Sequence, residues 1–455
     1  MAWVRRPGML LGLCAAGLIG LTAAGLALHI PGQLGIGSDR RLRVFVALCC
    51  AAGLIYAGAV VLVLRGGLPR RALWLILGSA AVLRAMVLVA PPYLSTDLYR
   101  YVWDGKVQAA GINPYRYIPD DPHLAFLRDR TIFPGINRAS YARTIYPPAA
   151  EAIFFLATRI SPTLLGMKAA MTALEAVAIW AMLGLLDRAG LPRTRVLIYA
   201  WNPLPIWEFA GNGHVDAIAV CFVALVLLAG AGGRRGLSAA ALAGAVLAKF
   251  LPAVLLPALW RRWDWRFAAI FAGLIALLYL PYLSAGRLVF GFLGGYAAQE
   301  GIDSGRGIFA LFALGHLVKL PVVAGRLYLV ALALLLAGMG AAMVFGPSAP
   351  ANPLAATRLM ARRALLLGSV LTVGLSPHYS WYFCWLLVPA CIVPWPSVLY
   401  LVSAAILLYL DPIHTKLLWP ALVYGPFAVL AARDAWKPAG AGALPAPPQA
   451  AERRA

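Results

Sequence analysis

The chain has 455 residues, of which 62% are hydrophobic and only 12% are charged, and its formal net charge is +22. A soluble protein of this length needs far more charge to cover its surface, so the composition excludes that class. The apolar runs are continuous rather than alternating, which argues against a transmembrane β-barrel. The composition therefore predicts a polytopic α-helical membrane protein.

Apolar runs recur along the whole chain, and most have a length that suits a bilayer core of roughly 30 Å. The N-terminal run follows Arg5 and Arg6, is long and lacks a clear cleavage site, so we expect a retained first helix rather than a signal peptide. We predict an all-α transmembrane helical bundle of about 12–14 helices, with residues 1–437 as one domain and 438–455 as a disordered tail. The candidate crossings are 9–30, 44–64, 72–90, 166–186, 196–209, 214–231, 238–249, 251–260, 267–283, 324–345, 364–376, 382–394, 396–410 and 417–432.

The excess of Lys and Arg lies largely in short links between apolar runs, which indicates the cytoplasmic side of a membrane. This reading leaves no need for a nucleic acid partner, and it predicts a cytoplasmic N-terminus. A loop at 91–146 then follows the third helix on the exterior face, and the stretch "SDRRLR" at 38–43 is an exception that would also lie outside. The basic links are Arg5-Arg6, 65–71, 187–195, 232–236, 261–266 and 358–363.

The exterior loop begins with the stretch "STDLYRYVWDGKVQAAGINPYRY" (95–117). On a helix over 96–108, Asp97, Arg100, Tyr101 and Asp104 share one face. The two carboxylates would lie roughly 10 Å apart along the helix axis, which suits a base and a second acid with another role. The alternative is an interfacial amphipathic helix whose charges merely face water.

The loop closes with "ARTIYPP" (142–148), which places Arg143 and Tyr146 near the mouth of the membrane domain. An arginine there suits bidentate binding of a phosphate, or equally contact with lipid headgroups. The following segment, 146–160, is too short to span comfortably and is expected to be re-entrant or to lie at the surface.

Polar residues also interrupt the apolar sequence between 201 and 220. Ionisable residues at membrane depth usually line a cavity. We expect a hairpin over 238–260 with Lys249 at its tip, because basic links on both sides require an even number of passes. The interrupting residues are Asn202, Glu208, Asn212, His214 and Asp216.

The stretch "SPHYSWYFCWLLVP" (376–389) carries His378 and several aromatic residues. Tyr379, Trp381 and Tyr382 fit an aromatic belt at the membrane interface. Aromatic faces also stack on sugar rings, and His378 has the chemistry to hydrogen-bond a hydroxyl or a phosphate.

Several familiar signatures are missing from the sequence. It contains no Walker A motif, no dinucleotide-binding glycine motif, no His-Glu-x-x-His and no Gly-x-Ser-x-Gly. The six cysteines show no metal-binding spacing and suit packing. Nucleotide-driven chemistry has no visible site, so we expect a substrate carried in the lipid.

Five of these stretches together resemble the GT-C superfamily of membrane glycosyltransferases, and most closely the bacterial polyprenyl-phosphate-mannose-dependent α-mannosyltransferases. They are "STDLYRYVWDGKVQAAGINPYRY", "NRASYARTIYPP", "NPLPIWEFAGNGHVDAI", "LAKFLPAVLLP" and "SPHYSWYFCWLLVP". The resemblance implies a bacterial inner-membrane enzyme with a lipid-phosphate sugar donor, mannose as the expected sugar, and inversion at the anomeric carbon. It also implies a catalytic aspartate in the first large exterior loop, a place that Asp97 occupies. That loop usually follows the first helix rather than the third, and 294–309 lacks the Trp and Asn expected there.

We therefore predict that Asp97 is the general base of sugar transfer to an acceptor hydroxyl. Arg143 and Lys249, with Arg100 behind them, are candidates for the phosphate. The expected partners are a polyprenyl-phosphate sugar donor, a glycan or lipid acceptor and membrane lipids. No cofactor is expected, although a divalent cation shared by two acids stays an alternative. The residues expected to shape the sugar or acceptor site are Asp104, Tyr146, His214, Asp216, His378 and Tyr379.

Two other functions fit parts of this pattern. A transporter or flippase for a lipid-linked sugar would want polar groups at mid-membrane and an internal repeat of helices. No repeat is obvious, and the charged cluster lies in a loop. A purely structural subunit leaves the clustered acids unexplained.

Overall fold

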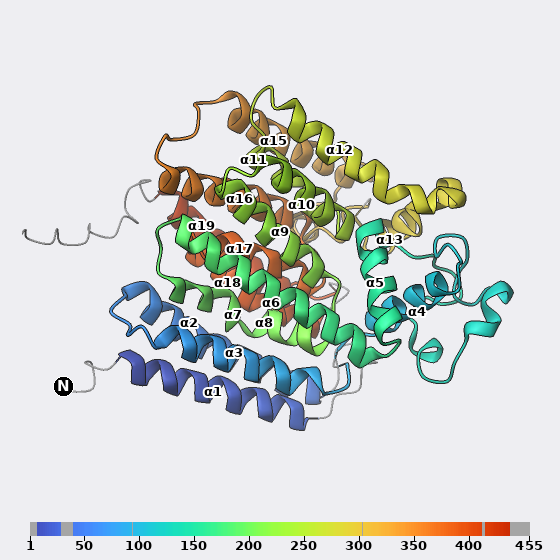
Figure 1. The fold of residues 1–455 in the computed structure, drawn as a ribbon, viewed down its shortest axis with the longest axis horizontal. Helices are drawn as coiled ribbons and strands as arrows, with labels where there is room; N and C mark the ends of the chain where they lie inside the picture. Colours follow the sequence, from blue (N-terminus) through green and yellow to red (C-terminus); the bar gives the residue numbers. More distant parts are fainter. Residues whose placement is uncertain (1–6, 29–39, 93, 303, 412–414, 437–455) are drawn as a thin grey trace, which may run out of the picture.

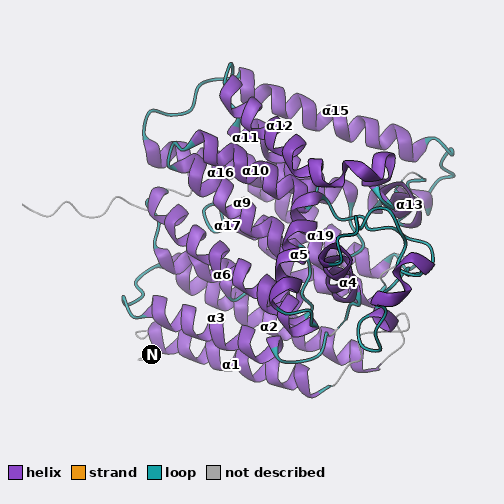
Figure 2. Ribbon diagram, turned by 45° about the vertical axis from the view of Figure 1, so that its right-hand side comes forward, coloured by secondary structure: helices purple, strands orange, loops and turns teal. Residues whose placement is uncertain are grey.

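The computed structural model describes residues 7–28, 40–92, 94–302, 304–411 and 415–436, and these residues form helices and loops without a strand. The helices stack side by side in a bundle, and a loop-rich region with α4 and α13 lies at one end of it (Figures 1 and 2). The all-α prediction is confirmed, whereas the expected tail at 438–455 lies outside the described residues.

Five helical stretches are long and apolar enough to cross a membrane, judged by length and composition. They are α1 (Pro7–Ala27), α2 (Arg40–Arg65), α6 (Leu164–Arg188), the stretch Trp265–Gln299, which is kinked at Gly286, and α15 (Ala324–Phe345). The last two expose most of their apolar side chains at the side of the bundle, where a membrane would cover them.

The other helical elements mostly overlap the expected crossings, although several are broken by 3-10 turns, α16 begins well before the expected residue 364, and α13 and α14 lie outside every expected crossing. They are α3 (Ala72–Leu88), α9 (Asp216–Ala231), α10 (Arg235–Ala248), α11 (Leu256–Leu259), α12 (Trp265–Tyr279), α13 (Leu293–Gln299), α14 (Phe309–Gly315), α16 (Pro353–Leu375), α17 (Leu387–Ala390), α18 (Pro396–Ala404) and α19 (Leu418–Trp436). The supposed basic link at 358–363 is wrong, because these residues lie inside α16.

The predicted crossing at 196–209 is not one helix. It consists of a 3-10 turn (Arg193–Val196), α7 (Leu197–Ala200), α8 (Pro203–Pro205) and a π-helical turn (Ile206–Gly211). Two prolines remove backbone donors there, and Asn202 begins the next turn by accepting a hydrogen bond from the backbone N–H of Leu204. The segment is buried throughout, so the break lies at the centre of the bundle.

The predicted hairpin over 238–260 is confirmed. Helix α10 runs from Arg235 to Ala248, and the return passes through a 3-10 turn (Leu251–Leu255) and α11. An ion pair between Arg235 and Asp264 joins the two open ends of the hairpin, and Lys249 follows α10 directly at the closed end.

The segment 91–160, which includes the loop predicted to lie outside, is built around two helices, α4 (Asp97–Ala109) and α5 (Pro148–Ile160). Gly111 ends α4 with a φ of 75°, a left-handed conformation that glycine adopts freely. Helix α5 packs against α4, α6 and α10, so it closes one end of the bundle (Figure 1). Two 3-10 turns lie between the helices, at Pro122–Leu127 and Phe133–Gly135.

Candidate active site

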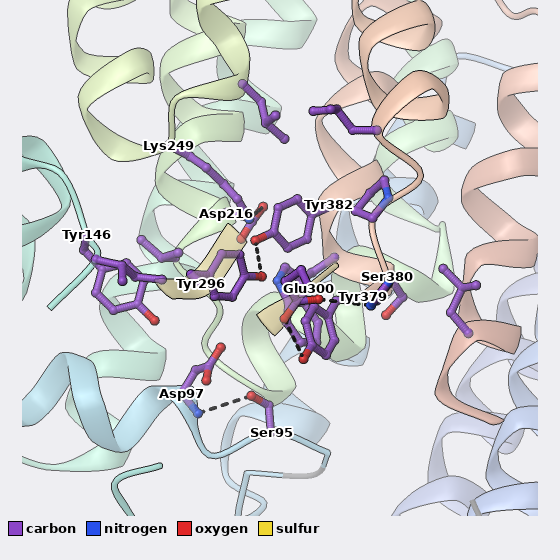
Figure 3. A pocket seen from close by; sticks show the side chains of 18 of the residues that line it. Ser95, Asp97, Tyr146, Asp216, Lys249, Tyr296, Glu300, Tyr379, Ser380 and Tyr382 are labelled. Carbon is purple, nitrogen blue, oxygen red and sulfur yellow. Dashed lines mark hydrogen bonds and ion pairs between the residues drawn. The ribbon is translucent and has the colours of Figure 1, made fainter. Parts of the chain in front are cut away.

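A cavity of about 890 Å³ opens where the segment 91–147 meets the bundle (Figure 3). Segments from α4, the 137–147 loop, α9, α10, α13 and the 372–382 stretch all contribute to it. Its polar and aromatic lining residues are Ser95, Thr96, Asp97, Tyr101, Asn137, Arg138, Tyr146, Asp216, Lys249, Phe250, Tyr296, Glu300, Thr372, Ser376, His378, Tyr379, Ser380, Trp381, Tyr382 and Tyr409.

Asp97 is the first residue of α4 and lines this cavity. It does not cap the helix, because Thr96 occupies the N-cap position. The side-chain amide of Asn137 donates to Oδ1 of Asp97 at 2.6 Å, and the backbone N–H of Asp97 donates to Ser95 Oγ at 3.2 Å. The carboxylate is therefore held in one orientation, and Oδ2 forms no hydrogen bond with a described residue.

Asp216 and Lys249 form an ion pair on another wall of the cavity (Figure 3). Asp216 begins α9 and Lys249 follows α10, so the pair ties the ends of two packed helices together. The distance from Lys249 Nζ to Asp216 Oδ1 is 2.6 Å, and Nζ lies 3.2 Å from the ring centroid of Tyr382. The buried Oδ2 of Asp216 accepts no hydrogen bond from a described residue.

A third wall comes from the C-terminal half of the chain. His378 Nδ1 lies 3.1 Å from Glu300 Oε2, and the Tyr379 hydroxyl donates to Glu300 Oε1 at 3.3 Å. The hydroxyls of Tyr296 and Tyr382 lie 2.9 Å apart. This wall presents a row of hydroxyl groups and aromatic faces to the cavity.

Glu208 lies fully buried behind this wall and connects it to the broken helix. Ser380 Oγ donates to Oε1 at 2.6 Å, and the Tyr409 hydroxyl donates to the same oxygen at 2.9 Å. The Asn212 amide donates to Oε2 at 3.0 Å, and His214 Nδ1 lies 3.0 Å from that oxygen. Each of these neighbours carries a group that can donate a hydrogen bond to the carboxyl oxygens.

His214 does not line the cavity itself, although the sequence prediction placed it in the sugar site. Its ring stacks on Trp381 with centroids 3.8 Å apart, and Trp381 stacks on Tyr379 at 4.7 Å. His214 therefore supports two aromatic residues that do line the cavity.

Arg100 and Asp104 also lie away from the cavity lining, because they pair with each other. Arg100 Nε lies 2.8 Å from Asp104 Oδ1, and Arg100 Nη1 donates to the carbonyl of Ala142 at 3.0 Å. Burial, and then the charge of Asp104, raise the pKa of Glu151 in α5, beside the pair, well above its usual range. The cluster braces α4 against α5 and the end of the loop.

Arg143, the other arginine that the sequence suggested for phosphate, is also absent from the lining. Its Nε donates to the carbonyl of Arg116 at 3.2 Å. Tyr146 does line the cavity, and its ring packs edge-on against that of Tyr101 at 5.0 Å.

The structure thus gathers Asp97, Tyr146, Asp216, Lys249, His378 and Tyr379 around one cavity. The sequence prediction missed Asn137, Arg138 and Glu300, which also line it. Asn137 and Arg138 begin the stretch "NRASYARTIYPP". Their closeness in sequence to Arg143 was the feature that could have identified them as site residues. Glu300 follows α13 directly, and it is an acid in the segment 284–307 that the sequence predicts to be a loop.

Comparison with known families gives one match. The model described as "Alpha-(1->6)-mannopyranosyltransferase, N-terminal domain" (the MptA_B family) matches residues 9–264. Comparisons with curated proteins and with solved structures give no match. The matched region carries Asp97, Arg138, Asp216 and Lys249. It also includes three of the five candidate membrane spans, and the other two, which begin at Trp265 and Ala324, lie beyond it. Since the match covers more than half of the sequence, this multi-pass membrane protein belongs to the alpha-(1->6)-mannopyranosyltransferase family and is a glycosyltransferase.

Proposed function

We propose that the enzyme transfers mannose from a polyprenyl-phosphate donor to an acceptor hydroxyl, with inversion at the anomeric carbon. The observation that carries the proposal is Asp97, a carboxylate fixed by Asn137 with its other oxygen unbound, in a cavity that also holds cationic side chains. This combination matches what the reaction needs, namely a base for the acceptor and positive charge for the leaving phosphate.

The transfer forms one bond and breaks one. The acceptor oxygen attacks the anomeric carbon while Asp97 takes the hydroxyl proton, and the bond from that carbon to the phosphate oxygen breaks with its electron pair staying on the phosphate. Attack on the face opposite the phosphate turns a β-linked donor into an α-linked product. The polyprenyl monophosphate then leaves into the lipid.

The remaining lining suits a sugar with a lipid carrier. Tyr296, Tyr379 and Tyr382 supply hydroxyls for hydrogen bonds, and the unbound Oδ2 of Asp216 is an acceptor for a sugar hydroxyl. Apolar residues also line the cavity and fit the first prenyl units. They include Leu42, Leu94, Leu251, Leu293 and Leu408.

We propose further that the cavity faces the exterior side of a bacterial inner membrane, with the N-terminus in the cytoplasm. The support is the positive charge at the opposite ends of the helices, such as Arg65, Arg188 and Arg234. The lining spans residues 42–409, which supports residues 1–437 acting as one domain.

The experiment supplies purified protein in lipid with polyprenyl-phosphate [³H]mannose and an α-1,6-mannose oligosaccharide. The proposal expects label in a longer oligosaccharide and release of polyprenyl phosphate. Label that moves between leaflets of a proteoliposome without a new glycoside would instead indicate the transporter or flippase, and a nucleotide-sugar donor that outperforms the lipid donor would refute the proposed substrate.

A further inference from the structure

We propose that Arg138 binds the phosphate of the donor and stabilises it as it leaves, an inference that rests on the proposed function. Three cationic or potentially cationic side chains line the cavity, namely Arg138, Lys249 and His378. Lys249 is matched by Asp216, with Nζ and Oδ1 2.6 Å apart, and His378 lies beside the carboxylate of Glu300 at 3.1 Å. Arg138 forms no ion pair with any residue that the structure describes.

The partners of Arg138 orient its guanidinium without neutralising it. Its Nε donates to Gln299 Oε1 at 3.1 Å, and its guanidinium carbon lies 5.8 Å from the ring centroid of Tyr296. Gln299 is itself held by a hydrogen bond to the Tyr141 hydroxyl at 3.2 Å. The contact with Gln299 uses one of the five N–H groups of the guanidinium, and its flat fork suits two oxygens of a phosphate.

The backbone of Arg138 points to the same role. Its φ is +56°, in the left-handed region that residues with a side chain seldom adopt. Such strain persists where the surrounding structure enforces it, often at functional sites. Here the preceding residue, Asn137, donates to Asp97. The same turn therefore places both the amide that orients the base and the guanidinium of Arg138 at the cavity.

The chemistry explains why an unneutralised cation is needed. The donor is a phosphodiester with one negative charge, and the departing polyprenyl phosphate gains a second charge as the carbon–oxygen bond breaks. The acceptor proton goes to Asp97, and Arg138 stays protonated throughout. A guanidinium already placed beside the phosphate stabilises the charge that develops in the transition state more than the charge of the donor.

The test replaces Arg138 with glycine, which adopts a φ of +56° without strain and deletes the guanidinium. Arg130→Gly is the matched control, because Arg130 is an exposed arginine of the same loop that does not line the cavity. We expect Arg138→Gly to keep or raise the midpoint of thermal unfolding, and to lower kcat about 100-fold or more. Added guanidinium ion should restore part of the loss, and Arg130→Gly should stay within about twofold of the parent.

A second measurement separates this inference from the proposed function. Purified protein is titrated with polyprenyl monophosphate alone, and Arg138→Gly should weaken its binding by about tenfold or more. If the parent transfers no mannose, the proposed function fails while this titration still tests Arg138. If a folded Arg138→Gly variant keeps near-parent turnover and phosphate affinity, or if Arg130→Gly loses as much of both, the assignment of Arg138 is overturned.

Discussion

Substitution of Asp97 by asparagine removes the proposed base with little change in shape. In the parent, the Asn137 amide donates to Oδ1 of Asp97 at 2.6 Å. An asparagine at position 97 can keep its own carbonyl oxygen in that place, so the side chain should hold its orientation while an amide replaces the unbound oxygen. The helix start should also survive, because Thr96 rather than Asp97 is the N-cap.

The expected loss follows from the value of general-base assistance. That assistance contributes about 10²–10⁴ in rate, which corresponds to about 2.7–5.4 kcal/mol of transition-state stabilisation at about 1.36 kcal/mol per tenfold. We expect kcat to fall by about 100-fold or more, with KM for the donor nearly unchanged. Asn137→Ala is the companion variant, because it keeps the base but frees its orientation, and it should cost about tenfold.

The assay is single-turnover transfer from polyprenyl-phosphate [³H]mannose, with enzyme in excess over donor so that product release does not limit the rate. Thermal unfolding of each variant in detergent gives the control for folding. The reasoning is refuted if well-folded Asp97→Asn transfers mannose at nearly the parent rate. The acid at Asp216, which also lines the cavity, would then be the next candidate.

Four further outcomes are expected. Glu208→Gln should raise KM and lower the unfolding temperature, because the new amide faces groups that already donate; unchanged values of both would contradict the role of Glu208 behind the wall. Asp104→Asn should lower stability by about 3 kcal/mol, since it leaves buried Arg100 unpaired, and the folded fraction should keep its kcat. Cysteine at exposed Ala109 should react with an impermeant maleimide in spheroplasts and cysteine at exposed Ala351 only after lysis; the reverse pattern would invert the proposed orientation. Finally, EDTA should leave the transfer rate unchanged, and a loss that Mg²⁺ or Mn²⁺ restores would refute metal-free transfer.

The sequence predicted the helical bundle from hydrophobic length, and it predicted the hairpin from the basic links on both sides of 238–260. It also predicted a helix over 96–108, close to the observed α4, because a helix of this length depends on neighbours within a few residues. The breaks in the 196–209 segment could not be predicted from its hydrophobicity, because a helix broken by two prolines and a π turn keeps the apolar composition of an intact crossing.

The choice of phosphate ligand depended on geometry that the sequence does not carry. Arg143 and Arg138 lie five positions apart in one loop, and only the turn at Arg138, with its positive φ, directs a guanidinium into the cavity. Likewise, Arg100 and Asp104 form an ion pair with each other. Nothing in their spacing of four residues distinguishes an internal ion pair from two ligands, because the same spacing serves both.

The cavity draws its walls from two parts of the chain that are separate in sequence. Asp97, Arg138 and Lys249 belong to the region matched by the family model, whereas Glu300, His378 and Tyr379 lie beyond residue 264. Substitutions in the later part can therefore alter the acceptor specificity while the proposed base and the proposed phosphate ligands stay unchanged. The arrangement lets the acceptor glycan change during evolution while the proposed reaction stays the same.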